Sequence, residues 1–295
     1  MRVRVSLFLL ALLPALASAQ PFDAPFAGIF TGAEVQSRYN VNAAAADFDG
    51  DGRTDLAVAR NVFAGGFTIL RGNADGLYDV PVHYGPVIGG GGPVPLPGNG
   101  LQGSWDLEPG DFDEDGDTDL IATNGEQPNL GSTVALWRNL GDGTFPAEPD
   151  TVHVGEGGPL EVDGADFNED GHLDLVVTRF GSWQQPSPVV VLLGDGTGGF
   201  SDPIEHAAFD GWADSYAEAA DLDGDGHLDL AVGYAASGEL AVLLGDGTGD
   251  FDPAVYYASD PSVLGLGSLA LADIDNDGDV DALAPGPFDH GQASA

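Results

Sequence analysis

The sequence predicts an all-β fold of the β-propeller type, built from four-stranded antiparallel blades, and three observations predict it. An acidic loop of one design recurs five times at intervals of about 55 residues, which is typical of repeat architectures. A second, glycine-rich turn follows each of the first four loops. Apolar runs with the character of strands flank both turns. The order within a unit is therefore that of a propeller blade, with four strands and two tight connections.

The acidic loops follow the pattern Asp-x-(Asp/Asn)-x-Asp-Gly-x-x-Asp and open at Asp47, Asp111, Asp166, Asp221 and Asp273. Positions 1, 3, 5 and 9 offer side-chain oxygens, and position 7 offers its backbone carbonyl. Ca²⁺ prefers about six to eight oxygen ligands in a flexible cage. Position 6 is glycine in every copy, where the chain must turn sharply around an ion. The sequence therefore predicts up to five Ca²⁺ sites.

The predicted metal-binding residues, including those that offer a carbonyl at position 7, are Asp47, Asp49, Asp51, Arg53 and Asp55; Asp111, Asp113, Asp115, Asp117 and Asp119; Asp166, Asn168, Asp170, His172 and Asp174; Asp221, Asp223, Asp225, His227 and Asp229; and Asp273, Asp275, Asp277, Asp279 and Asp281. Crowded carboxylates repel each other by roughly 3–4 kcal/mol per close pair at an effective dielectric constant near 20. We therefore expect the loops to require a cation. Five merely solvated acidic turns are the alternative, and the shared ligand spacing disfavours it.

These loops are not EF-hands. An EF-hand has a bidentate carboxylate at position 12 and helices on both sides. Position 12 is apolar here, occupied by Val58, Ala122, Val177, Val232 and Ala284. The residues after position 9, such as Leu175–Val177, form short apolar runs typical of buried strands. The acidic loop is therefore expected to join two strands.

The second turns contain the hairpin signal Asp-Gly in all four repeats that carry them, and in the first repeat it stands within Asn-Ala-Asp-Gly. The apolar runs before them indicate a third strand in each unit, and the runs after them a fourth. The expected third strands are residues 67–70, 134–137, 189–193 and 240–244.

The paired motifs of the third repeat, residues 166–177 and 191–200, resemble the FG-GAP/VCBS-type repeat of bacterial secreted proteins. The acidic loops are also similar to those in the propeller of integrin alpha chains. The resemblance covers about residues 22–285. It implies a propeller, usually with seven blades, that binds calcium on the face carrying the loops between first and second strands. It implies no single activity.

The fifth repeat departs from this pattern, because its third strand and second turn are missing after Ala284. Residues 22–25, in contrast, align with the start of a fourth strand. Two alternatives remain: a fragment of a longer, seven-bladed ring, which we favour, and a five-bladed ring with an incomplete last blade. The expected domain division is a signal peptide over residues 1–19 and a propeller over residues 20–295.

Composition indicates an exported protein. Arg2 and Arg4 precede an apolar core over residues 7–16, and Ala17, Ser18 and Ala19 form a cleavage-type motif. That core is too short to span a membrane. The chain contains no cysteine, so calcium is the expected replacement for disulfides. The predicted location is extracellular or at the cell surface.

The formal net charge is −40, and all eight cationic side chains are arginines. Nucleic acids and anionic membranes are disfavoured as partners, because both require basic patches. Five Ca²⁺ ions would still leave a charge of about −30. The large surplus is compatible with a saline habitat.

Catalysis would require residues that break the repeat, and none stands out. His172 and His227 occupy position 7 of their loops, and His83, His153 and His206 are expected to share a packing position with Tyr257. No nucleophile elbow, Ser-His-Asp order or zinc spacing is evident. The chain is therefore predicted not to be an enzyme.

A ligand-binding face is expected opposite the calcium loops, where the connections vary. Three tryptophans lie there, Trp105, Trp183 and Trp212. Aromatic platforms beside polar groups suit sugar rings or extended peptides. Trp105 and Trp212 could equally cap the core of their blades.

Three functions follow from this reading. The favoured one is a secreted, calcium-binding adhesion or recognition module for glycan or protein ligands. The alternatives are a polysaccharide lyase or hydrolase on a calcium propeller, and a structural scaffold within a larger surface protein. The sequence does not specify the ligand, the number of blades or the oligomeric state.

Overall fold

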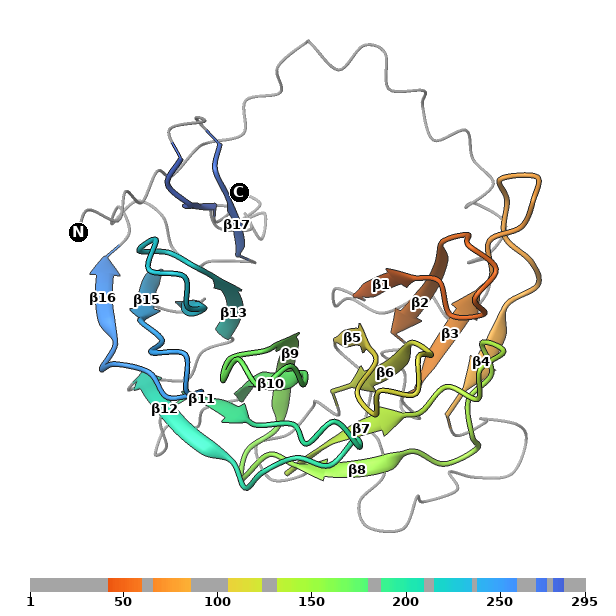
Figure 1. Ribbon diagram of the computed structural model, residues 1–295, viewed down its shortest axis with the longest axis horizontal. Coiled ribbons are helices and arrows are strands. Elements are labelled where there is room, and N and C mark those ends of the chain that lie inside the picture. Colours follow the sequence, from red (N-terminus) through yellow and green to blue (C-terminus); the bar gives the residue numbers. More distant parts are fainter. Residues whose placement is uncertain are drawn as a thin grey trace, which may run out of the picture. The chain divides into compact units, whose positions relative to one another are not determined.

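The computed structural model describes residues 42–59, 66–85, 106–123, 132–179, 187–209, 215–234, 238–258, 269–274 and 278–283. Within these ranges the secondary structure consists of eighteen β-strands (Figure 1). No helix in this part of the chain is long and apolar enough to cross a membrane. The predicted signal peptide, residues 1–19, lies outside the described residues, as do Trp105, Trp183 and Trp212.

The strands form sheets of four antiparallel members in chain order, as the sequence predicts. Blade 1 comprises β1 (Ala43–Ala46), β2 (Asp55–Ala59), β3 (Phe67–Leu70) and β4 (Val82–Tyr84). Blade 2 comprises β5 (Leu107–Gly110), β6 (Asp119–Ala122), β7 (Thr133–Trp137) and β8 (Asp150–His153). Blade 3 comprises β9 (Pro159–Ala165), β10 (Asp174–Arg179), β11 (Ser187–Leu192) and β12 (Ile204–Phe209). Blade 4 comprises β13 (Ser215–Ala220), β14 (Asp229–Tyr234), β15 (Glu239–Leu243) and β16 (Val255–Ala258).

The described part of blade 5 is a two-stranded sheet of β17 (Ala270–Ala272) and β18 (Asp281–Leu283). The all-β fold class and the four-stranded antiparallel blade are therefore confirmed. The number of blades in a complete ring stays a prediction.

The chain divides into two compact units. The N-terminal unit contains blades 1 and 2, within Ala11–Val162, together with Gly194–Phe200. Among the described residues, the C-terminal unit contains those within Asp163–Leu193 and those from Ser201 onward.

Blades pack face to face because their strands are apolar on both sides. In β6 and β10 every residue is buried, as expected for the inner strands of stacked sheets. In the N-terminal unit, Phe67 and Ile69 of blade 1 share a core with Ala135 and Trp137 of blade 2. The rings of Phe67 and Trp137 meet edge to face, with centroids 5.4 Å apart.

The C-terminal unit repeats this arrangement. Val189 and Val191 of blade 3 pack with Ala241 and Leu243 of blade 4. The opposite face of blade 4 packs through Leu240 and Val242 against Leu269 and Ala282 of blade 5.

A buried carboxylate, Asp106, ties blade 2 to its surroundings in the N-terminal unit. Its Oδ2 accepts a hydrogen bond from Val162 N at 2.9 Å, and its Oδ1 accepts hydrogen bonds from Leu107 N and from Asn42 Nδ2. Burial raises the pKa of this carboxyl, although the three donors oppose the shift. No repeat motif marks Asp106 in the sequence.

The expectation that three histidines share one packing position is wrong. Strand register pairs His83 with Thr68 and His153 with Thr133, whereas His206 pairs with Val189. Because Tyr84 pairs with Phe67 and Tyr257 with Leu240, only His206 is equivalent to Tyr257. The side chain of His206 packs edge to face on Phe251 of the next blade, as Tyr84 packs on Phe145.

Candidate cation-binding loops

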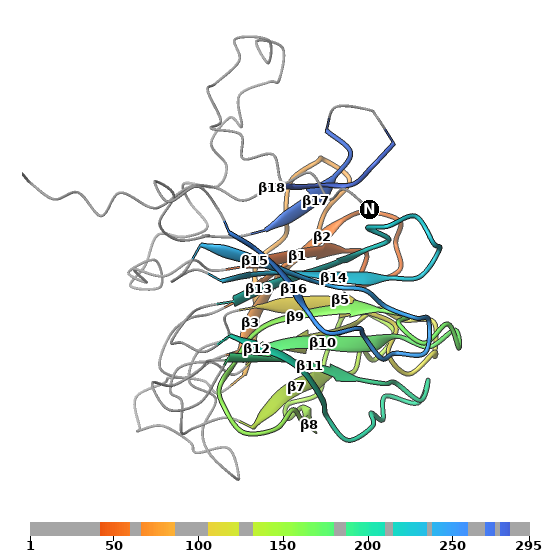
Figure 2. The same ribbon diagram turned by 90° about the vertical axis from the view of Figure 1, so that its left-hand side faces the viewer.

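Each acidic loop joins the first and second strands of its blade, as predicted. In an antiparallel meander this connection lies at the same end of the sheet as the second turn between strands three and four. Figure 2 shows the acidic loops and second turns together at one end of the strands within a blade. The candidate site therefore consists of the acidic loop together with the second turn beside it.

The backbone of the loop turns at position 6. All five position-6 glycines have a left-handed φ: 83° at Gly52, 95° at Gly116, 93° at Gly171, 98° at Gly226 and 94° at Gly278. A Cβ would find open space at each of these glycines. The conformation, and not a lack of room, therefore requires glycine here.

Position 4 is also left-handed, which the sequence pattern did not reveal. Gly50 and Gly224 occupy it in loops 1 and 4, with φ of 70° and 80°. Glu114 and Glu169 occupy it in loops 2 and 3, with φ of 57° and 58°. A non-glycine residue in this region costs roughly 1–2 kcal/mol.

One of these glutamates makes a contact between blades. The Glu169 carboxylate in loop 3 lies 2.5 Å from His227 Nδ1 in loop 4. The hydrogen bond and charge of Glu169 raise the pKa of His227 above its usual value, although desolvation opposes them. In loop 4, the position-7 side chain therefore contacts the neighbouring blade.

The position-1 carboxylate fixes the loop from inside. In loop 1, Asp47 accepts hydrogen bonds from Asp51 N at 3.1 Å and from Gly52 N at 2.7 Å. The N–H of the position-6 glycine donates to the position-1 carboxylate in all five loops. The position-5 carboxylate in turn accepts the N–H of position 7 in loops 1 to 4.

Position 9 has a second task beyond its predicted role as a ligand. In loop 2, Asp119 Oδ2 accepts from Phe112 N at 3.2 Å, and Oδ1 accepts from Asn139 N at 2.8 Å in the second turn. Asp55 and Asp229 bridge in the same way to Gly72 N and Gly245 N. The position-9 carboxylate therefore connects the acidic loop to the second turn of its own blade.

Burial and neighbouring carboxylates act on these position-9 groups. Desolvation, with added repulsion from Asp113 and Asp115, raises the pKa of Asp119 to about 6 against the hydrogen bonds it accepts. Burial likewise raises the pKa of Asp55 and of Asp229. Metal-free loops therefore hold crowded carboxylates at a cost in free energy.

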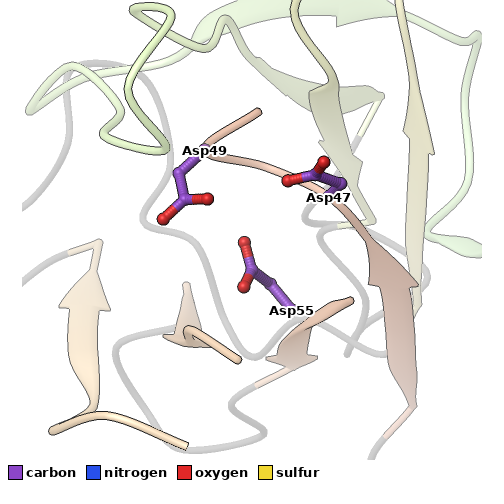
Figure 3. A group of neighbouring side chains, drawn as sticks. All are labelled: Asp47, Asp49 and Asp55. Carbon is purple, nitrogen blue, oxygen red and sulfur yellow. The ribbon is translucent and has the colours of Figure 1, made fainter. Parts of the chain in front are cut away.

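The remaining carboxylate oxygens converge. In loop 1, ligand atoms of Asp47, Asp49 and Asp55 all lie within 4.8 Å of one another, and Figure 3 shows the three carboxylates facing a common space. The same spacing groups Asp111, Asp113 and Asp115 in loop 2, and Asp221, Asp223 and Asp225 in loop 4.

Loop 2 also contains two buried oxygens that accept no hydrogen bond, Asp111 Oδ1 and Asp113 Oδ1. A buried carboxylate oxygen without a donor costs free energy unless a cation fills the gap. A hard divalent cation therefore fits the residues that the structure brings together, at positions 1, 3 and 5 in loops 2 and 4 and at positions 1, 3 and 9 in loop 1.

Within the described part of the chain, the predicted ligands of loops 3 and 5 do not appear among the converging groups of three carboxylates. In loop 3, the Asn168 amide donates to Asp170 Oδ2 at 2.9 Å and accepts from Asp170 N at 2.9 Å. In loop 5, Asp273 and Asp281 accept backbone hydrogen bonds as in the other loops, whereas Asp275 and Asp277 lie outside the described residues. Ligation by the carbonyls of Arg53, Asp117, His172, His227 and Asp279 stays a prediction.

Loops 1, 2 and 3 are joined to the next blade by hydrogen bonds that the sequence pattern does not predict. Phe112 O accepts a hydrogen bond from Gly198 N at 2.8 Å, and Phe167 O accepts one from Gly249 N at 3.1 Å. In blade 2, Asn139 Nδ2 reaches Phe48 O at 2.7 Å instead. The signal for them in the sequence is the glycine pattern of the second turn, which also serves the hairpin.

Comparison with protein families gives one match, the FG-GAP-like repeat, over residues 47–122, 111–177, 180–232 and 221–284. Three of the four matches begin at the first aspartate of an acidic loop, and three end within the strand after an acidic loop. No curated protein matches the chain.

Among solved structures, similar chains include a lectin from Agrocybe aegerita that recognises non-reducing terminal N-acetylglucosamine, at 21% identity and a TM-score of 0.47, with 73% of this chain and 51% of the lectin covered. The pore of the Photorhabdus luminescens Tc holotoxin matches at 21% identity and a TM-score of 0.39, over 83% of this chain and 11% of the other. The V. cholerae biofilm matrix protein Bap1 matches at 16% identity and a TM-score of 0.37, over 79% and 41%. The chain thus spans about half the length of the lectin and less of the other two.

Proposed function

The chain belongs to the FG-GAP-like repeat family, and on that premise we propose that it is a calcium-stabilised extracellular recognition module whose ligand is a glycan or a protein. The observation that carries the proposal is the convergence of carboxylates in repeated loops, with two orphaned buried oxygens in loop 2. Every acidic group of metal-binding spacing found among the described residues belongs to one repeated loop design. Repetition of this kind supports a stabilising cation more than a single catalytic centre.

The role of calcium would be structural. Bound Ca²⁺ would neutralise the carboxylates at positions 1, 3 and 5, with position 9 at the base of the loop. Because acidic loops 1 to 4 are hydrogen-bonded to second turns, ordering these loops would also order contacts between neighbouring blades. Calcium binding is then coupled to folding, as in other metal-dependent domains.

The expected ligand-binding surface is the end of the blades opposite the acidic loops. Its connections, with Trp105, Trp183 and Trp212, are the variable part of the repeat and lie outside the described residues. Glycans and extended peptides are the proposed ligands, and a net charge of −40 argues for neutral or cationic ones. The proposed location is extracellular, and the proposed role is binding and not catalysis.

Calcium dependence can be tested by calorimetric titration and thermal melts of the mature chain in Ca²⁺, Mg²⁺ and EDTA at matched ionic strength. We expect a Ca²⁺-selective rise in melting temperature and a stoichiometry of up to five, the number of acidic loops. Asp115→Asn and Asp225→Asn should each remove about one site. Asp75→Asn, an exposed carboxylate outside the acidic loops, is the matched control and should remove none. Equal melting temperatures in Ca²⁺ and Mg²⁺ would contradict selective calcium binding.

Recognition can be tested separately with a glycan array and a peptide library, both probed in Ca²⁺ and again in EDTA. Binding that requires Ca²⁺, and that Trp183→Ala abolishes without altering the melting temperature, is the expected result. Release of oligosaccharides from a polysaccharide panel would favour an enzyme instead.

A further inference from the structure

Blades 1 and 2 carry an arginine directly after their third strand, where blades 3 and 4 carry a leucine. Strand register makes Arg71, Arg138, Leu193 and Leu244 equivalent, because Leu70, Trp137, Leu192 and Leu243 each pair with the residue after the position-9 aspartate. The exchange of a cation for an apolar side chain divides the repeats into two classes.

Arg138 joins three parts of the N-terminal unit. Its Nη1 donates to Asp113 Oδ2, the position-3 carboxylate of loop 2, at 2.6 Å. The same Nη1 donates to Thr197 O, in the second turn within Gly194–Phe200, at 2.9 Å. Its Nε donates to Asp150 Oδ2 at 2.9 Å on β8. A guanidinium carries its positive charge at every ordinary pH, so this charge faces the loop permanently.

Arg71 repeats the design in blade 1. Its Nη2 donates to Asp142 O at 2.7 Å in the second turn of blade 2, and its Nη1 lies 3.7 Å from Asp49 Oδ2, the position-3 carboxylate of loop 1. Both arginines therefore place a positive charge on an acidic loop while holding the second turn of another blade.

The leucine class lacks this charge. Leu193 packs within the core between blades 3 and 4, and a Cβ at Gly249 would lie 2.6 Å from its Cδ2. Position 3 of loop 3 is Asn168, so the carboxylate and its arginine are absent together. Loop 4 keeps all four aspartates and has Leu244 at the position equivalent to Arg138, so it is the natural comparison for loop 2.

We propose that Arg71 and Arg138 act as built-in counter-cations, which keep loops 1 and 2 and their contacts with the next blade assembled without calcium and which make these loops weaker calcium sites than loop 4. The inference rests on the proposed calcium binding. A fixed guanidinium lowers the repulsion within the metal-free loop and repels an arriving divalent cation. By linkage, the free energy by which the arginine stabilises the metal-free loop is lost from the free energy of calcium binding.

The test compares wild type with Arg138→Leu, which installs the residue found in blades 3 and 4, and with Arg138→Gln and Arg138→Lys. Calcium titrations and melts in EDTA and in saturating Ca²⁺ are run at one ionic strength. The loss of the positive charge in the Leu and Gln variants should move one site to about tenfold tighter binding. The same two variants should lower the melting temperature more in EDTA than in Ca²⁺. Arg138→Lys keeps the charge and should bind as wild type does.

The reciprocal variant, Leu244→Arg, should weaken one tight site and reduce the response of the melting temperature to Ca²⁺. Circular dichroism and gel filtration establish that each variant is folded. Equal losses of melting temperature in both buffers, or weaker calcium binding by Arg138→Leu, would overturn the inference and leave the arginine a structural contact only. A wild-type chain with no response to Ca²⁺ would instead refute the proposed function itself, whatever the variants do.

Discussion

At the scale of single residues, the carboxylates of one loop divide into two groups. Asp119 is fully buried, and both of its oxygens accept backbone hydrogen bonds from two different connections. Asp115 is exposed and accepts one hydrogen bond inside its own loop. The first residue holds the blade together whether or not a metal is bound, and the second is available chiefly to a cation.

Substituting these two residues should separate the roles. Asn in place of Asp119 keeps one acceptor oxygen but turns an amide N–H₂ donor toward one of the two backbone N–H groups. We expect a loss of about 1–3 kcal/mol in the free energy of unfolding that is already present in EDTA. Asp115→Asn should leave stability in EDTA unchanged or raised, because repulsion falls, and should reduce the stabilisation by Ca²⁺. Denaturant titrations in both buffers measure this. Equal behaviour of the two variants would contradict the division.

His206 is a second residue whose effect on folding stability can be tested, here as a function of pH. Its Nε2 is buried without a hydrogen-bond partner, and desolvation lowers its pKa although Asp250, at 3.8 Å, acts in the opposite direction. The unfolded chain therefore takes up a proton before the folded chain does, so this residue removes stability as the pH falls below about 6.5.

Replacing His206 by tyrosine, the residue at the equivalent positions 84 and 257, should remove that loss. We expect His206→Tyr to melt higher than wild type near pH 5.5 in Ca²⁺, with a smaller difference near pH 8. His153→Tyr, the same substitution at an exposed histidine on the outer strand, is the control variant. A constant difference across the pH range would show that packing, and not protonation, separates the variants.

At the scale of elements, the second turn both closes a hairpin and docks on another blade. Gly143 and Gly198 have φ of 68° and 75°, so glycine is favoured by conformation alone. They also lie against the arginines, since a Cβ at Gly198 would be 2.5 Å from Arg138 Nη2, and one at Gly143 would be 3.1 Å from Arg71 Nη2. Glycine is therefore favoured at these two positions both by the left-handed backbone and by the lack of room beside the arginine.

A matched pair of alanine substitutions separates the two constraints. Gly76 has a φ of 72° in the second turn of blade 1, and a Cβ there would find open space, so Gly76→Ala should cost about 1–2 kcal/mol for the left-handed backbone. Gly198→Ala should add roughly 1–3 kcal/mol from displacement of the Arg138 side chain. Chemical denaturation gives both values. Equal losses would mean that the arginine moves aside freely.

At the scale of the whole molecule, the main electrostatic feature is the excess of acidic over basic side chains. The chain has 48 acidic and eight basic side chains. Many of the acidic residues lie in the repeated loops, and some of these loops also contact a neighbouring blade. Calcium would therefore act on contacts between blades as well as on the loops.

The sign of the pH dependence should then differ with and without calcium. In EDTA, the raised pKa values of Asp55, Asp119 and Asp229 mean that the folded chain binds protons more readily than the unfolded chain, so its stability should fall as pH rises through about 6. In Ca²⁺, protons compete with the metal, so stability should rise over the same range. Thermal melts from pH 5 to pH 8 test this, and parallel profiles in the two buffers would be inconsistent with carboxylates as the metal ligands.

The sequence by itself determined the repeat, the strand order within a blade, the sharp turn at the position-6 glycines and the spacing of the loop carboxylates, because each of these depends on short stretches of consecutive residues. Only the tertiary structure decided what depends on partners distant in the chain. Asp119 meets Asn139, Arg138 meets Thr197, Asn139 meets Phe48 and Asp106 meets Val162 across 20 to 91 residues. The register of the fourth strand likewise set His206 apart from His83 and His153, since one residue of shift turns a side chain to the other face of a sheet. Local spacing specifies which loops can hold a cation, whereas the packing of successive blades determines which of their carboxylates are already engaged.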